Sequence, residues 1–208
     1  MKQYVIFDVD GTLNQTELYA IEAYQKALSK RKIEAKPEDI IPCIGLSPSA
    51  IVNHFFGTLN EKEMKTWKND IQTFEYELMK KKGRPFYGIE NLLKKLRQSG
   101  YGLAICSNAF MDHIEHVLDA IGLTEYFDCI GSLELGKDKT IILKNLLHNL
   151  KAEKACMVGD RRFDLIAAHE NNIPMIGCRY GYAPEEIADA DIVVENPESI
   201  FTAVKKLL

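Results

Sequence analysis

Five or six short apolar runs, continuous rather than alternating with polar residues, constrain the fold of this chain most strongly. They cover residues 4–7, 102–106, 127–130, 155–158, 174–178 and 192–194. A strand with one wet face alternates apolar and polar side chains, whereas a strand buried on both faces is apolar throughout. Strands of the second kind occur in parallel sheets that helices cover on both sides.

Helical patterns separate these runs in the C-terminal half. Residues 90–99 and 112–121 each place their leucines, isoleucines and valines on one face, and a glycine follows each segment at Gly100 and Gly122. Glycine directly after an amphipathic segment is a common helix terminator. The alternation of strand and helix predicts an α/β fold with a doubly wound parallel sheet.

Residues 15–84 interrupt this alternation. They contain no apolar run of comparable strength and instead show helical patterns over 16–32, 47–56 and 61–82. Within them we interpret Ser47 as a helix cap and Trp67 as a core residue. We expect a small all-α domain inserted after the first strand, so that residues 1–14 and 85–208 form the α/β core.

Composition excludes several classes of protein. The 208 residues carry a formal charge of -4, and Lys and Arg are scattered, which argues against a nucleic-acid partner. The N-terminal segment is too short for a secretory signal, and no window is long enough for a membrane span. Five dispersed cysteines without C-x-x-C pairs indicate small buried side chains in a reducing cytoplasm. The sequence makes no prediction of oligomeric state.

Two carboxylates follow the first apolar run, in the motif D-x-D-G-T at residues 8–12. Ligands of open parallel sheets bind beyond the carboxyl ends of the strands, so Asp8 and Asp10 would project into that crevice. Two acids this close repel each other unless they share a cation or a proton. A surface turn is the alternative, since Asp and Gly are common turn formers.

Ser107 and Asn108 end the second apolar run, where a hydroxyl and an amide could donate to an oxyanion. Their alternative is a cap for the helix that follows. Lys137 and Lys139 precede a helical pattern, and either could neutralise a phosphate or a carboxylate. The alternative there is a solvated charge cluster. Of the two lysines, the start of the helix favours Lys139.

The run at 155–158 closes on the motif GDxxxD at residues 159–164. Asp160 and Asp164 are four apart, so a helix that begins here would turn both toward one side. Oxygen ligands of this kind suit Mg²⁺. Acids that complement a helix N-terminus are the alternative.

In this order the four features resemble the motifs of the haloacid dehalogenase superfamily. The resemblance covers residues 1–14 and about 85–208, and the helical segment 15–84 is similar to the small cap domain of that superfamily. Residues 86–88 (FYG) and 179–182 (RYGY) look like the phosphoglycolate-phosphatase-like branch. The resemblance implies a magnesium-dependent phosphatase of a small phosphorylated metabolite, phosphoglycolate being the first candidate.

The same resemblance implies a role for each motif residue. Asp8 would attack phosphorus and form an aspartyl-phosphate, while Asp10 would protonate the leaving alcohol and then activate water. Ser107, the backbone amide of Asn108 and Lys139 would hold the phosphoryl oxygens. The Mg²⁺ ligands would be the Asp8 carboxylate, the Asp10 carbonyl and the Asp160 carboxylate, with Asp164 orienting a metal-bound water or Lys139.

Other functions on this fold remain open at this point. A sugar phosphomutase similar to β-phosphoglucomutase would need a longer-lived aspartyl-phosphate, and a pyrophosphatase would need a different leaving group. Dehalogenation does not use the second acid of the D-x-D motif, so Asp10 argues against it. A non-catalytic binding domain is disfavoured because every chemical group is retained.

Overall fold

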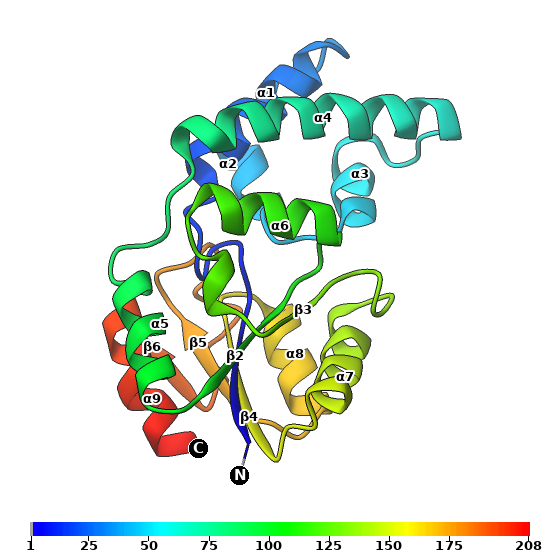
Figure 1. The fold of residues 1–208 in the computed structure, drawn as a ribbon. Helices are drawn as coiled ribbons and strands as arrows, with labels where there is room; N and C mark the ends of the chain where they lie inside the picture. Colours follow the sequence, from blue (N-terminus) through cyan, green and yellow to red (C-terminus); the bar gives the residue numbers. More distant parts are fainter. Residues whose placement is uncertain (1) are drawn as a thin grey trace.

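Six strands form one sheet in the order β3-β2-β1-β4-β5-β6 in the computed structural model, which describes residues 2–208 (Figure 1). The strands are β1 (Gln3–Phe7), β2 (Gly102–Cys106), β3 (Cys129–Gly131), β4 (Lys154–Gly159), β5 (Met175–Cys178) and β6 (Ile192–Val194). Every neighbouring pair is parallel. The predicted doubly wound α/β fold is confirmed.

All six apolar runs became strands, but the third is displaced. The sequence predicted it over 127–130, whereas β3 covers Cys129–Gly131. The side chain of Asp128 explains the difference, because its carboxylate accepts from the Leu103 amide at 3.1 Å and from the Arg97 guanidinium at 2.7 Å. The Asp128 side chain thus accepts the hydrogen bond of a backbone amide of β2 just before the regular pairing of β2 and β3 begins.

Helices cover both faces of this sheet. Helices α5 (Ile89–Gln98) and α9 (Ile200–Leu207) pack on one face, and α7 (Lys139–Leu150) and α8 (Arg162–Glu170) on the other (Figure 1). Central strand β1 serves both layers, since Val5 and Phe7 join one apolar cluster and Ile6 the other. Burial on both faces accounts for the unbroken apolar runs.

The segment 15–84 is helical and lies beyond the carboxyl ends of the strands (Figure 1). Its elements are α1 (Glu17–Ser29), α2 (Pro37–Ile40), the 3-10 helix Ile41–Cys43, α3 (Pro48–Phe56) and α4 (Glu61–Lys82). Helices α1 and α4 pack along each other. The chain enters this segment near residue 15 and leaves it near residue 84. These two places lie side by side, with the Gln15 amide donating to the Arg84 carbonyl at 3.1 Å. The division at residues 14/15 and 84/85 stays a prediction.

Helix α6 (Met111–Ala120) follows β2 and supports the segment 15–84 from below (Figure 1). It contacts α4, while its residues Ile114, Val117 and Leu118 belong to the apolar cluster that also contains Val5 and Phe7 of β1. Among the described residues, no helix combines the length and apolarity that crossing a bilayer requires.

Strands β1 and β4 lie side by side where the strand order reverses. Connections leave this point toward opposite edges of the sheet, so the loops after β1 and β4 diverge and leave a crevice between them. The fold therefore places the ends of these two strands at its most probable ligand site, the position that Asp8 and Asp160 occupy.

Candidate active site

Four separated motifs converge on this crevice. Asp8 follows β1, Ser107 follows β2, Asp160 follows β4, and Lys139 is the first residue of α7. All four residues are buried, with exposed fractions between 0% and 4%. Charged and polar side chains are almost never this buried unless they are paired or bind a ligand. The free-energy cost of burying these side chains therefore has to be offset by contacts among them and by a ligand that binds there.

Lys139 provides the first part of that compensation. Its Nζ lies 2.7 Å from Oδ1 of Asp8 and 2.7 Å from Oδ1 of Asp164. Although burial favours a neutral amine, the two carboxylates raise the pKa of Lys139 above its ordinary value and keep it charged. Helix α7 aims this side chain because it begins at residue 139, where the Asp138 side chain caps it by accepting from the Ile141 amide at 3.0 Å.

Lys137 lies elsewhere. It is exposed and lines a cavity under the helical segment, and Lys139 alone of the two lysines reaches Asp8. The interpretation of 136–140 as a solvated charge cluster is therefore wrong for Lys139, which is 4% exposed.

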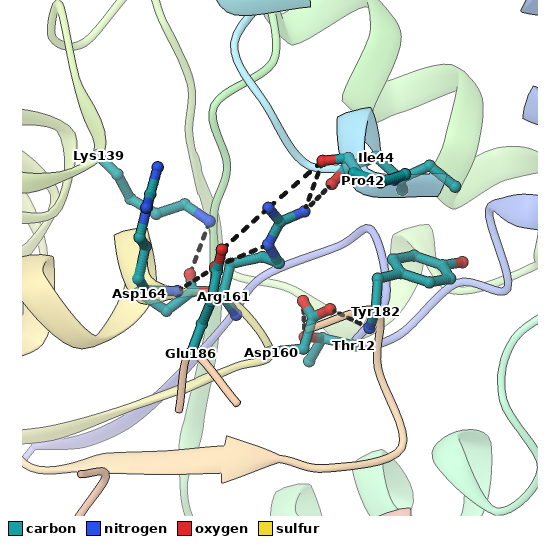
Figure 2. Close-up of polar contacts among 10 residues, drawn as sticks. Thr12, Pro42, Ile44, Lys139, Asp160, Arg161, Asp164, Tyr182 and Glu186 are labelled. Carbon is teal, nitrogen blue, oxygen red and sulfur yellow. Dashed lines mark hydrogen bonds and ion pairs between the residues drawn. The ribbon is translucent and has the colours of Figure 1, made fainter. Parts of the chain in front are cut away.

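The carboxylates of the GDxxxD motif have different partners (Figure 2). Asp160 accepts from the Tyr182 amide at 2.8 Å and, weakly, from the Thr12 hydroxyl at 3.4 Å. Asp164 accepts from Lys139 with one oxygen and from the Arg161 amide with the other, at 3.1 Å. Because burial is not fully compensated at Asp160, its pKa rises to about 7. Asp164 is thus committed to protein partners, whereas Asp160 retains acceptor capacity.

Two glycines allow this close packing. Gly11 has φ +80°, a conformation that side chains resist, and a Cβ there would lie 2.4 Å from Oδ2 of Asp160. At Gly159 a Cβ would lie 2.2 Å from Cγ of Asp164. The glycines of both motifs are therefore needed for the approach of the acids as well as for turns.

Asp10 points away from this pair of acids, toward the helical segment. Its Oδ1 accepts from the Thr16 hydroxyl at 2.6 Å, and the Asn14 amide in turn donates to that hydroxyl at 2.8 Å. Asp10 also lines the cavity under the helices. The position suits a group that exchanges a proton with a molecule in that cavity. The surface-turn alternative is wrong for both acids, because Asp8 and Asp10 are buried.

Ser107 and Asn108 are buried, and among residues 2–208 neither side chain has a hydrogen-bonding partner. The helix-cap alternative is wrong for them, because α6 begins at Met111 and its N-cap position is Phe110. By contrast, Ser47 does cap α3, as the sequence indicated, accepting from the Ala50 amide at 3.4 Å. The strand end thus presents a hydroxyl and an amide that are free to bind a ligand.

A divalent cation fits the charge of the site. Asp8, Asp160 and Asp164 can each bring one oxygen within 4.8 Å of the others. Lys139 neutralises only one of these three negative charges, and buried carboxylates in excess are costly. The hard oxygen donors match the preference of Mg²⁺, which takes one or two carboxylates and keeps several waters. Since Asp164 is already engaged, Asp8 and Asp160 are the carboxylates that would hold the ion.

Comparison with known proteins agrees with this geometry. The family model of haloacid dehalogenase-like hydrolases matches residues 5–178. The chain belongs to that family. It is 22% identical to the phosphoglycolate phosphatase of Mesorhizobium japonicum, over 89% of this chain and 86% of the relative.

Two solved structures share the whole fold of this chain. A predicted phosphatase of Clostridium acetobutylicum superposes with a TM-score of 0.88 at 24% identity, covering 100% of both chains. The β-phosphoglucomutase of Clostridium difficile superposes with a TM-score of 0.83 at 20% identity, covering 99% of this chain and 96% of that one. A phosphatase and a mutase therefore share this architecture, and the chemistry of this hydrolase has to be argued from its site.

Arg161, which sequence reasoning passed over, joins the site to the helical segment (Figure 2). It is 5% exposed; its guanidinium donates to the Ile44 carbonyl at 2.6 Å and to Oε2 of Glu186 at 3.0 Å. The Pro42 carbonyl is a weaker partner at 3.3 Å. The motif gives no indication of this role, because Arg161 occupies one of the unspecified positions of GDxxxD. A second arginine, Arg162, follows it directly.

We expect Arg161→Ala to lower the free energy of unfolding by about 2–4 kcal/mol, because charged hydrogen bonds are lost and two loop carbonyls lose their donor. The matched control is Arg162→Ala, whose side chain is exposed and whose backbone amide still donates to Glu186. Urea unfolding of both variants measures the difference. Equal stabilities of the two would show that the Arg161 contacts contribute nothing to the fold.

Proposed function

We propose that this chain is a magnesium-dependent phosphatase that hydrolyses small phosphomonoesters through an aspartyl-phosphate on Asp8. The observation that carries the proposal is the buried cluster in which the Asp8 carboxylate meets Lys139 beside Asp160. A carboxylate held in place by a fixed cation and facing a crevice is suited to nucleophilic attack. The names of the relatives support phosphate esters as substrates, with phosphoglycolate as the first candidate.

In the first step an Asp8 oxygen forms a bond to phosphorus as the bond from phosphorus to the alcohol oxygen breaks. Asp10 gives its proton to the departing oxygen, so that a neutral alcohol leaves. In the second step Asp10 takes a proton from a water molecule, and the resulting hydroxide displaces the Asp8 carboxylate from phosphorus. Inorganic phosphate is released and both acids return to their starting states.

Three further residues support these steps. Ser107 and Asn108, which have no protein partner, would donate to the phosphoryl oxygens. Lys139 holds Asp8 in place and offsets the charge of the phosphoryl group. Removal of one such donor typically costs on the order of 10²–10³ in rate. Each of these roles follows from a group already oriented in the free protein, so little reorganisation accompanies the reaction.

Mg²⁺ would be held by the Asp8 and Asp160 carboxylates and by the Asp10 carbonyl. When bound, the ion supplies charge neutralisation between an anionic nucleophile and an anionic substrate. Asp164 keeps Lys139 in position rather than binding the ion, since both of its oxygens have protein donors.

Turnover of p-nitrophenyl phosphate should depend on Mg²⁺ and stop when EDTA is added, because without the ion like charges meet at the nucleophile. We expect at least about a 100-fold loss of rate, restored by excess Mg²⁺. Release of p-nitrophenolate is the measurement. Undiminished turnover in EDTA would contradict a metal-dependent mechanism.

The site also accommodates a phosphomutase, in which the aspartyl-phosphate would pass its phosphoryl group to a second hydroxyl. Release of free phosphate distinguishes the two reactions. A sugar bisphosphate intermediate with little free phosphate would favour the mutase. For the surroundings of the enzyme we propose the cytoplasm, because the five cysteines are dispersed and four of them are buried as small apolar side chains.

A further inference from the structure

A cavity of about 500 Å³ lies between the helical segment and the sheet. Asp10 and Asn108 line it at the level of the catalytic motifs, while Trp67 and Glu75 of α4 line it from the helical side. Cavities of several hundred Å³ take ligands of drug-like size. Glycolate, with two carbons, would leave most of this space unfilled.

Aromatic and aliphatic side chains form most of the cavity wall. Tyr24, Trp67, Tyr76 and Phe110 supply four rings from three different helices or their ends. Trp67, which the sequence assigned to the core, is 4% exposed and both packs against Tyr24 and lines this cavity. Such walls favour an apolar ligand, and ring faces in addition attract cations.

Glu75 is a buried acidic residue in this wall. Its residue is 9% exposed, and within residues 2–208 no donor lies within hydrogen-bonding distance of its carboxyl group. The nearest titratable side chain that faces it is His113 on α6, with Nδ1 at 4.0 Å. Burial raises the pKa of Glu75 to about 7, the direction expected of an acid that lacks a compensating partner. A buried carboxyl group without a donor is costly, so a ligand that brings one is favoured.

We propose that this cavity binds the alcohol half of the substrate, and that this half is an apolar group of aromatic size bearing a protonated amine that pairs with the Glu75 carboxylate. The inference rests on the phosphatase function proposed above and specifies its substrate class. Lys68, Asp112 and Lys137 also line the cavity but are exposed and solvated. Asp10 accepts from the Thr16 hydroxyl, whereas Glu75 is buried without a hydrogen-bond donor. An alcohol bearing a carboxylate would face both Glu75 and Asp10.

Three aryl phosphates of similar size test the charge preference. They carry at the para position an aminoethyl group, an ethyl group or a carboxymethyl group. Phosphate release gives kcat/KM for each, alongside phosphoglycolate. We expect the amine to exceed the ethyl compound by about 10-fold or more, as a charge-assisted hydrogen bond implies, and the carboxylate to be the poorest of the three.

Glu75→Gln should reduce the ratio of amine to ethyl compound to nearly one, because the amide keeps the shape but loses the charge. Glu77→Gln is the matched control, since Glu77 is exposed on the same helix and pairs with Lys81. It should keep the wild-type ratio. A wild-type ratio near one, or a ratio that survives Glu75→Gln, overturns the pairing. A kcat/KM for phosphoglycolate above those of all three aryl phosphates overturns the assignment of the cavity.

Binding of tyramine, the dephosphorylated amine, separates this proposal from the phosphatase function. Calorimetry should show that tyramine binds the wild type about 10-fold or more tightly than Glu75→Gln. Binding of tyramine without turnover of any phosphate ester would contradict the phosphatase function but would still support the assignment of the cavity. Turnover of p-nitrophenyl phosphate without tyramine binding and without a preference for the amine would support the phosphatase function and contradict the assignment of the cavity.

Discussion

Asp8→Asn is expected to abolish turnover of p-nitrophenyl phosphate, lowering kcat by on the order of 10⁴-fold or more. The carboxamide has nearly the same shape but is a very poor nucleophile toward phosphorus. Asp8 is buried at the end of β1, where the Lys139 ammonium group holds its carboxylate at 2.7 Å. Asp160 is the carboxylate assigned to the ion, and Asp164 is committed to Lys139 and to the Arg161 amide.

A second measurement isolates the covalent step. Wild-type enzyme quenched in acid during turnover should retain phosphate that hydroxylamine releases, as an acyl phosphate does, and Asp8→Asn should retain none. Asp119→Asn, an exposed change on α6, controls for the substitution itself. Melting curves establish that each variant is folded. Activity of Asp8→Asn above about a tenth of wild type would rule out Asp8 as the nucleophile.

The sheet could be predicted from the sequence because burial on both faces leaves a direct mark on it. Residues 102–106 and 192–194 are apolar throughout, and β2 and β6 have those same bounds. At β3 the prediction failed by two residues at its start, since the hydrogen bonds of one polar side chain, Asp128, decide where the ladder begins. An apolar run predicts which residues are buried, but it does not predict which backbone amide donates to a polar side chain.

The convergence of the site was predictable for a similar reason. Asp8, Ser107 and Asp160 all follow apolar runs directly, and the carboxyl ends of parallel strands meet at one edge of a sheet. Lys139 was less certain, because it lies on a helix start whose distance from β1 depends on how α7 packs. Sequence reasoning could favour it over Lys137 only by the position of the helix.

Glu75 could not have been found in this way. Helix α4 is strongly charged, and a glutamate within EKEMKTWKNDIQTFEYELMKKK looks solvated. Its burial arises from tertiary packing, because α4 lies over α6 (Figure 1). Both helices contribute residues that line the cavity. Arg161 is a similar case, since the carbonyls of Pro42 and Ile44 that it binds lie more than a hundred residues away in the chain. Residues that act across the two parts of the fold carry no local signal.

Lys139→Ala should affect stability and turnover together. Removal of its ammonium group leaves Asp8 and Asp164 buried without their common partner. Breaking a buried ion pair by removing one member typically costs about 3–5 kcal/mol. We also expect kcat to fall by on the order of 10²–10³-fold, because Asp8 loses its orientation and the phosphoryl group loses a positive charge.

The matched control is Lys137→Ala, two residues earlier, in the loop that precedes α7. Lys137 is exposed, so its loss should change the free energy of unfolding by no more than about 0.5 kcal/mol. Urea unfolding and p-nitrophenyl phosphate turnover, both without and with Mg²⁺, measure the two variants. A divalent cation should recover part of the stability of Lys139→Ala, since it offsets the same carboxylates, but it cannot restore the lysine's hold on Asp8. If Lys137→Ala were inactive and Lys139→Ala active, Lys137 would be the active-site lysine. The role of Lys139 in holding Asp8 would then be wrong.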